Sequence, residues 1–303
     1  MQFLNADKMH VDFVGKRRLF MIISVIAILI GIASLVVRGG LNYGIDFAGG
    51  TMVQVRFTKD LNSDQIRKAL SGLDIGEASI QQFEGEGTHE FLIRVEKSKS
   101  NLVSLSDEIK AVLDKAFGAE NVDIRRVEMV GPKVGKDLRR QGMMAIVYAM
   151  IGILLYVTVR FELRFAVGAI VALIHDVMIT VGVFALLDKE FSLPIVAALL
   201  AIVGYSLNDT IVVYDRIREN MKGAGKTNFI TRVNDSINQT LSRTILTSLT
   251  TMLVLISLFF LGGGVIHDFA FAMIIGVTVG TYSSIFIASP VVISMQPKKK
   301  TSK

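Results

Sequence analysis

Three charged side chains lie inside stretches of this sequence that are apolar and long enough to cross a lipid bilayer. They are Asp176, Asp209 and Arg243. A charged side chain at the centre of a bilayer costs at least about 2.5 kcal/mol, and intramembrane ionisable residues typically belong to proton or ion paths. We therefore interpret these three residues as a candidate proton path.

The expected depths of the charges favour Asp209 and Arg243 as a pair. Asp209 lies five residues before the end of its apolar stretch at Tyr214, or about 7–8 Å at 1.5 Å per residue. Arg243 lies two residues after the start of the next stretch at Leu241, or about 3 Å. Because consecutive spans run antiparallel, both charges fall at comparable depth. A structural ion pair that only fixes helix packing is the alternative interpretation.

Asp176 is harder to assign, because it lies eleven residues into its stretch, near the middle, with no matched cation at that depth. A neutral aspartic acid that bonds to a neighbouring helix would serve structure as well as proton transfer. Both roles stay open, and Asp176→Asn is expected to be milder than Asp209→Asn.

Polar and small residues accompany these charges and predict a hydrated seam between helices. The polar residues of the seam are Tyr205, Ser206, Asn208, Thr210, Thr247 and Thr251. In the last apolar stretch, Gly276, Gly280 and Ser284 recur every four residues, a spacing that predicts a packing ridge of small residues.

Six apolar stretches must position these side chains, and each approaches or exceeds the roughly 20 residues that a spanning helix needs. Hydrophobic residues make up 51% of the chain and charged residues 20%, against about 25% in soluble proteins. We predict a polytopic α-helical membrane protein with six transmembrane helices at 19–37, 143–159, 165–187, 193–214, 241–261 and 269–293.

Lysine and arginine in the short connecting segments predict the orientation. Of the loops assigned to the other side, 188–192 and 262–268, only the first offers a basic residue, Lys189. Both termini are therefore expected in the cytoplasm, with an N-terminal segment 1–18 and a basic tail 294–303. Among the termini and short connecting segments, the basic residues gather in 1–18, 160–164, 215–240 and 294–303.

One large segment, 38–142, is then expected on the periplasmic, extracytoplasmic side. Its patterns of apolar residues predict strands and helices in the order βαββαβ, a ferredoxin-like α+β domain. That fold hosts many functions and indicates none. The strands are predicted at 51–57, 78–83, 90–95 and 122–129, the helices at 62–70 and 102–117, and a hairpin turn at 84–88.

Several kinds of chemistry are excluded by composition. The chain has no cysteine, and no two of its four histidines stand at a metal-ligand spacing, so we expect no metal and no cofactor. Two membrane aspartates would suit an intramembrane aspartyl protease only if they shared a proton. Here their expected depths differ, so we predict no covalent catalysis. Basic residues flank apolar stretches and form no stripe, which argues against nucleic-acid binding.

Several motifs together resemble the SecD/SecF family of the RND superfamily, over nearly the whole chain. Gly-Ile-Asp-Phe-Ala-Gly-Gly follows the first span, and Leu-Ile-His-Asp-Val occupies 173–177. The stretches 204–220 and 243–251, which contain Asp209 and Arg243, also match, and 204–220 is highly specific. The residues of the first motif that carry the resemblance are Gly44, Asp46, Phe47, Gly49 and Gly50.

The resemblance implies a subunit of the Sec protein translocase accessory complex in the bacterial inner membrane. Such a subunit uses the proton-motive force together with SecD to complete preprotein export. The resemblance implies SecD, the SecYEG channel, SecA and the preprotein as partners, with YidC and YajC as further neighbours, and it makes Asp209 and Arg243 the proton-path residues. The alternatives are a passive scaffold that links the channel to other membrane proteins, and a subunit of another RND-type proton-driven transporter.

Overall fold

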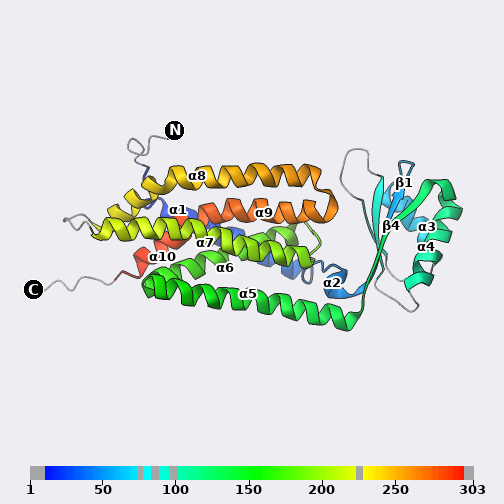
Figure 1. Cartoon of the computed structure of the whole chain (residues 1–303), viewed down its shortest axis with the longest axis horizontal. Coiled ribbons are helices and arrows are strands. Elements are labelled where there is room, and N and C mark those ends of the chain that lie inside the picture. Colours follow the sequence, from blue (N-terminus) through cyan, green and yellow to red (C-terminus); the bar gives the residue numbers. More distant parts are fainter. Residues whose placement is uncertain (1–10, 74–77, 83–88, 96–101, 223–227, 297–303) are drawn as a thin grey trace, which may run out of the picture.

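The computed structural model describes residues 11–73, 78–82, 89–95, 102–222 and 228–296. Within these ranges, six helices are long and apolar enough to cross a membrane, which confirms the six predicted spans. They form a bundle with a small sheet domain, residues 50–130, at one end (Figure 1). The helices are α1 (Arg17–Val37), α5 (Pro132–Arg160), α6 (Leu163–Leu186), α7 (Leu193–Lys222), α8 (Phe229–Leu261) and the interrupted helix Gly263–Ser294.

Several helices run well beyond the predicted apolar stretches. The α5 helix begins at Pro132, directly after an extended Gly131, because proline favours the first helical position. The α8 helix begins at Phe229, where the Asn228 side chain accepts a hydrogen bond from the amide of Ile230. Apolarity marks only the part of a helix that suits lipid, whereas caps and helix-forming polar residues carry the helix further.

Helices α6, α7 and Gly263–Ser294 form the interior of the bundle. Half or more of their apolar segments is buried, against 11% for each of α1, α5 and α8. The α1 helix crosses α6 closely, because a Cβ atom on Gly31 would lie 2.8 Å from the Cα of Gly182. The outer helices leave apolar faces that lipid or a partner protein must cover.

The last span is interrupted rather than continuous. It consists of α9 (Gly263–Ser283), a π-helical turn η3 (Ser284–Ala288) and α10 (Ser289–Ser294). Pro290 has no amide hydrogen, so it cannot continue the regular α-helical ladder. The Ser289 hydroxyl donates to the Ser284 carbonyl, five residues earlier, at 2.9 Å. Turns of this kind are frequent at functional sites.

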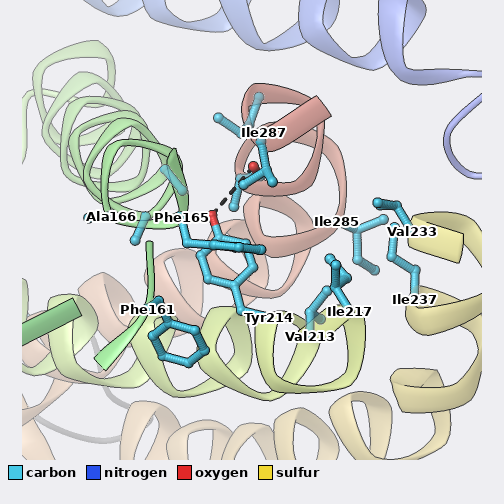
Figure 2. Close-up of a cluster of buried hydrophobic side chains, with 14 of the residues drawn as sticks. Phe161, Phe165, Ala166, Val213, Tyr214, Ile217, Val233, Ile237, Ile285 and Ile287 are labelled. Atoms are coloured by element: carbon cyan, nitrogen blue, oxygen red, sulfur yellow. Dashed lines mark hydrogen bonds between the residues drawn. The ribbon is translucent and has the colours of Figure 1, made fainter. Parts of the chain in front are cut away.

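Tyr214 of α7 joins the π-helical turn to the core at the end of the bundle away from the sheet. Its fully buried ring lies among Phe161, Phe165 and Ile217, and its hydroxyl donates to the Ala288 carbonyl at 3.4 Å (Figure 2). This contact ties α7 to the last span.

The sheet domain follows the predicted order of strands and helices. Its four strands pair antiparallel in the order β2-β3-β1-β4. The predicted hairpin turn at 84–88 lies outside the described residues. The elements are β1 (Gly50–Phe57), α3 (Ser63–Leu70), β2 (Ala78–Gln82), β3 (Glu90–Val95), α4 (Leu102–Phe117), a short 3-10 turn η2 (Ala119–Asn121) and β4 (Val122–Val130).

One face of the sheet packs beneath α3 and α4. Alternate residues Val53, Val55 and Phe57 of β1 are at most 1% exposed and form the core with both helices. Asn62 and Gln65 form a capping box that fixes the start of α3. Figure 1 shows α3 and α4 on the side of the sheet away from the bundle, so the other face of the sheet is turned toward the bundle.

Candidate functional site: a buried polar network in the bundle

Asp176 lies at the centre of a network that joins three helices. It is fully buried in α6, and its Oδ2 accepts hydrogen bonds from Ser206 of α7 at 2.6 Å and from Ser283 of α9 at 2.8 Å. Its Oδ1 lies 2.8 Å from Nδ1 of His175. The carboxyl group thus holds the interior helices together.

His175 extends this network toward α1. Its ring stacks on Tyr282 with 6.0 Å between centroids, and its buried Nε2 makes no hydrogen bond to any described residue. The Tyr282 hydroxyl donates to the Phe20 carbonyl at 2.6 Å and lies 2.9 Å from the Ser24 hydroxyl, which therefore donates to it. His175 thus adds an imidazole group to the network.

Asp209 differs from Asp176 in its hydrogen bonds. It is 2% exposed, and its Oδ2 is buried without a hydrogen bond to any residue in the described ranges. Asp209 follows Ser206 by three residues, so it lies about 4.5 Å further along α7. Its Oδ2 is free to take a proton without breaking a hydrogen bond.

Arg243 is near enough to Asp209 to act through its charge, but it forms no ion pair with it within 4 Å between described residues. Its side chain is exposed on α8 in this single chain. A tight structural ion pair between the two residues is therefore not what the structure contains.

A chain of hydroxyl groups runs beside Asp209 across three helices. Thr281 of α9, a hydroxyl neighbour of Asp209, donates to the Val277 carbonyl at 2.8 Å. Its hydroxyl therefore accepts from Ser248 of α8, 2.7 Å away, while Ser248 accepts from Tyr205 of α7 at 3.4 Å. This direction of donation links α7 to α9 through α8.

The other polar residues predicted for the seam are not brought together. Asn208 is exposed, Thr210 is buried and Thr251 is half-buried. Thr247 donates to the Arg243 carbonyl of its own helix at 2.9 Å. Of the predicted supporting residues, Tyr205 and Ser206 are the two that join these networks.

Two of the three members of the small-residue ridge of the last span pack on α7. A Cβ atom on Gly276 would overlap Ile202, and one on Gly280 would lie 2.9 Å from the Cβ of Ser206. Ser284 instead bonds the Thr281 carbonyl, and Ser283 reaches Asp176. Ser283 follows Gly276 by seven residues, so helical spacing would have indicated it.

The glycine-containing motif forms the junction between the bundle and the sheet. The amide of Gly44 donates to the Phe191 carbonyl at 3.0 Å, and the Phe191 amide donates to the Asn42 carbonyl at 2.7 Å. Asp46 of the short helix α2 (Ile45–Ala48) accepts from the Leu193 amide at 2.8 Å and so caps the start of α7.

Phe47 and Gly49 complete this junction. Phe47 is buried in the core cluster at the sheet end of the bundle. Gly49 has a φ of +79°, and a Cβ atom there would lie 2.9 Å from Pro132 at the start of α5. A side chain fits neither the backbone conformation nor the space, which accounts for glycine at this position.

Among the described residues, no three histidine, aspartate, glutamate or cysteine side chains gather as a metal site would require. The buried network itself consists of carboxyl and imidazole groups, with hydroxyl groups between helices as hydrogen-bond partners.

Comparison with known proteins agrees with the motifs. Residues 109–298 match the family described as "Protein export membrane protein SecD/SecF, C-terminal", and residues 33–60 match the "SecD/SecF GG Motif". The chain is 53% identical to the protein translocase subunit SecF of Magnetococcus marinus, over 97% of this chain and 94% of the relative. It is 44% identical to SecDF of Thermus thermophilus, over 88% of this chain and 36% of that longer protein.

Solved structures share the arrangement of the chain. This chain resembles the crystal structure of SecDF from Thermus thermophilus, with a TM-score of 0.85 at 40% identity. The match covers 96% of this chain and 39% of the SecDF chain. A SecDF structure described as a "Super-membrane-facing form" matches at the same identity, over 95% of this chain, with a TM-score of 0.67.

Proposed function

Because the chain belongs to the SecD/SecF family of protein-export membrane proteins, we propose that it uses the proton-motive force, with SecD, to complete preprotein export as a Sec translocase accessory subunit. The observation that carries the proposal is Asp209, a buried carboxyl group inside a spanning helix with one oxygen free of hydrogen bonds. A group that only packs helices would be expected to have its polar atoms bonded.

In the proposed mechanism, Asp209 gains and loses the proton and Arg243 controls that exchange. The attraction of the arginine charge for a carboxylate changes as α8 approaches or withdraws from α7. Asp176, with His175, couples the change to the interior helices, because Asp176 bonds to both α7 and α9. Proton transfer at Asp209 thereby drives movement of the helices, without covalent catalysis.

SecD is the proposed obligate partner. The SecDF relatives carry the matching segment within a chain more than twice as long, since this chain spans 36% and 39% of their lengths. The exposed Arg243 and the apolar faces of α1, α5 and α8 are where such a partner would pack. We further propose SecYEG, SecA, the translocating preprotein, YidC and YajC as neighbours, on the basis of the family resemblance.

We also propose that the chain lies in the inner membrane with both termini cytoplasmic and the sheet domain periplasmic. The positive-inside rule supports this orientation. The strand order β2-β3-β1-β4 with two covering helices supports a ferredoxin-like fold for the domain.

A reporter enzyme that works only in the cytoplasm should be inactive when inserted within the sheet domain and active when fused to the C-terminus. The inactive insertions must be shown by immunoblot to be present in the membrane. Activity from the insertion in the sheet domain would contradict the orientation.

The function is tested by export into inverted membrane vesicles that contain SecYEG, SecA and SecD. Adding this chain should increase the release of completed preprotein only while a proton gradient is imposed. An equal increase after an uncoupler has removed the gradient would favour the passive scaffold instead.

A further inference from the structure

One ion pair joins the sheet domain to the bundle. Arg94, near the end of β3, pairs with Glu190, and their side chains are only 9% and 16% exposed. Its neighbours Ile93 and Val95 are fully buried beneath α3 and α4, so Arg94 projects from the opposite face of the sheet, toward the bundle. Between described residues, it is the only ion pair that connects the sheet domain with the spanning helices.

Glu190 occupies a position from which it can respond to both membrane aspartates. It lies in the short connection between α6, which carries Asp176, and α7, which carries Asp209. The connection is held by the Phe191 backbone, and a Cβ atom on Gly44 would overlap the Glu190 carboxyl group. A shift of either helix therefore moves the partner of Arg94.

The surroundings of Glu190 make its pairing with Arg94 costly to lose. Burial raises the pKa of the Glu190 carboxyl group above its ordinary value, and the charges of Asp268 and Asp46 act in the same direction. The Arg94 guanidinium opposes them and favours the ionised form. Removing one partner of a buried pair leaves an uncompensated charge. We therefore expect the pair to open only where water can hydrate both Arg94 and Glu190.

We propose that Arg94 and Glu190 form a releasable latch, through which movement of α6 and α7 holds or frees the sheet domain. The proposal rests on the proposed proton-driven function and names the contact that transmits it. The Arg94 Nε is buried without a hydrogen bond to any described residue, so the guanidinium is not locked by a full set of partners.

The absence of native cysteine permits a direct test. Arg94→Cys and Glu190→Cys are combined in the full chain, assembled with SecD and SecYEG in vesicles, and joined by a bis-methanethiosulfonate spacer. The linked protein should lose the gradient-driven stimulation of preprotein release that the unlinked double-cysteine protein retains, and cleavage of the spacer by a reductant should restore that retained level. Stimulation of the linked protein equal to that of the unlinked double-cysteine protein would overturn the latch.

The rate of cross-linking gives a readout that does not depend on export. It should fall when the proton gradient is imposed on vesicles with SecA, ATP and preprotein, and it should stay constant when Asp209→Asn is added. If the cross-linking rate of the double-cysteine chain with native Asp209 does not change with the gradient, the latch is overturned, even if Asp209 behaves as proposed. If instead the rate responds while preprotein release does not, the proposed function fails and the latch stands.

Charge exchange separates a latch from a merely stabilising contact. Arg94→Gln and Glu190→Gln should each reduce gradient-driven stimulation, and the double exchange Arg94→Glu with Glu190→Arg should restore much of it. The matched control is Arg38→Gln, because Arg38 pairs with Asp188 of the same connection at 3.2 Å but both residues belong to the bundle. Equal losses in the control and in Arg94→Gln would overturn the latch, because any change to this connection would then impair the protein.

Discussion

Asp209→Asn should leave a folded protein that assembles with SecD but gives no gradient-driven increase in preprotein release. Asparagine keeps the size and much of the hydrogen bonding of aspartate but cannot bind and release a proton in the same range. Because the Asp209 Oδ2 makes no hydrogen bond to the described residues, the substitution removes the titration and few contacts. The measurement is preprotein release from vesicles with the gradient on and off, at equal amounts of assembled complex.

Arg243 variants are the companion measurement. Arg243→Lys keeps the charge but lacks the planar guanidinium, so stimulation should be reduced, and Arg243→Gln should abolish it. Arg243 is exposed and forms no close ion pair within the described residues, so neither variant should unfold the chain.

Full gradient-driven stimulation in Asp209→Asn would mean that Asp209 packs helices and that the scaffold interpretation is correct.

Asp176→Leu should cause the largest loss of stability among the membrane aspartate variants. The substitution removes the acceptor of Ser206, Ser283 and His175 at once. Each buried polar group left without a partner costs about 1–3 kcal/mol, so a loss of several kcal/mol is expected. Asp176→Asn retains an acceptor oxygen, so it should stay folded and reduce export only in part.

Thermal unfolding of the purified complex in detergent measures this difference. Asp209→Leu is the matched control, because it introduces the same apolar side chain in place of an aspartate whose Oδ2 makes no hydrogen bond to a described residue. The midpoint of Asp176→Leu should lie clearly below that of Asp209→Leu. Equal midpoints would show that the Asp176 network contributes little to packing.

The spans and the order of the sheet domain could be predicted because each depends on local pattern. Apolar length marks a spanning helix, and alternation around Val53 and Val55 marks a strand with one buried face. The extension of α5 back to Pro132 was missed, since its first turns are polar and apolarity was the only criterion. Likewise, α8 begins twelve residues before its predicted apolar start at 241.

The candidate site was only partly predictable, because its contacts depend on how distant helices meet. Ser283 and Asp176 are separated by 107 residues, and Arg94 and Glu190 by 96. His175 lies beside Asp176 in the Leu-Ile-His-Asp-Val motif, yet it was not among the candidate site residues predicted from the sequence. The π-helical turn after Ser283 has no signal in apolar periodicity.

The sequence ranked Asp209 above Asp176 by the presence of a cation at matching depth. The structure supplies a different reason for the same order. Asp176 is fixed by two serine hydroxyls and by His175, whereas Asp209 retains an unbonded oxygen. We therefore propose proton exchange at Asp209 and the coupling of helices at Asp176.

The most direct test of this assignment is the protonation state of Asp209 in the assembled complex. Infrared difference spectra between alkaline and acidic conditions, recorded on protein labelled with ¹³C-carboxyl aspartate, should show a carboxylic-acid C=O band that is absent in Asp209→Asn and retained in Asp176→Asn. A spectrum of Asp209→Asn that keeps every such band of the unsubstituted protein would contradict proton exchange at Asp209.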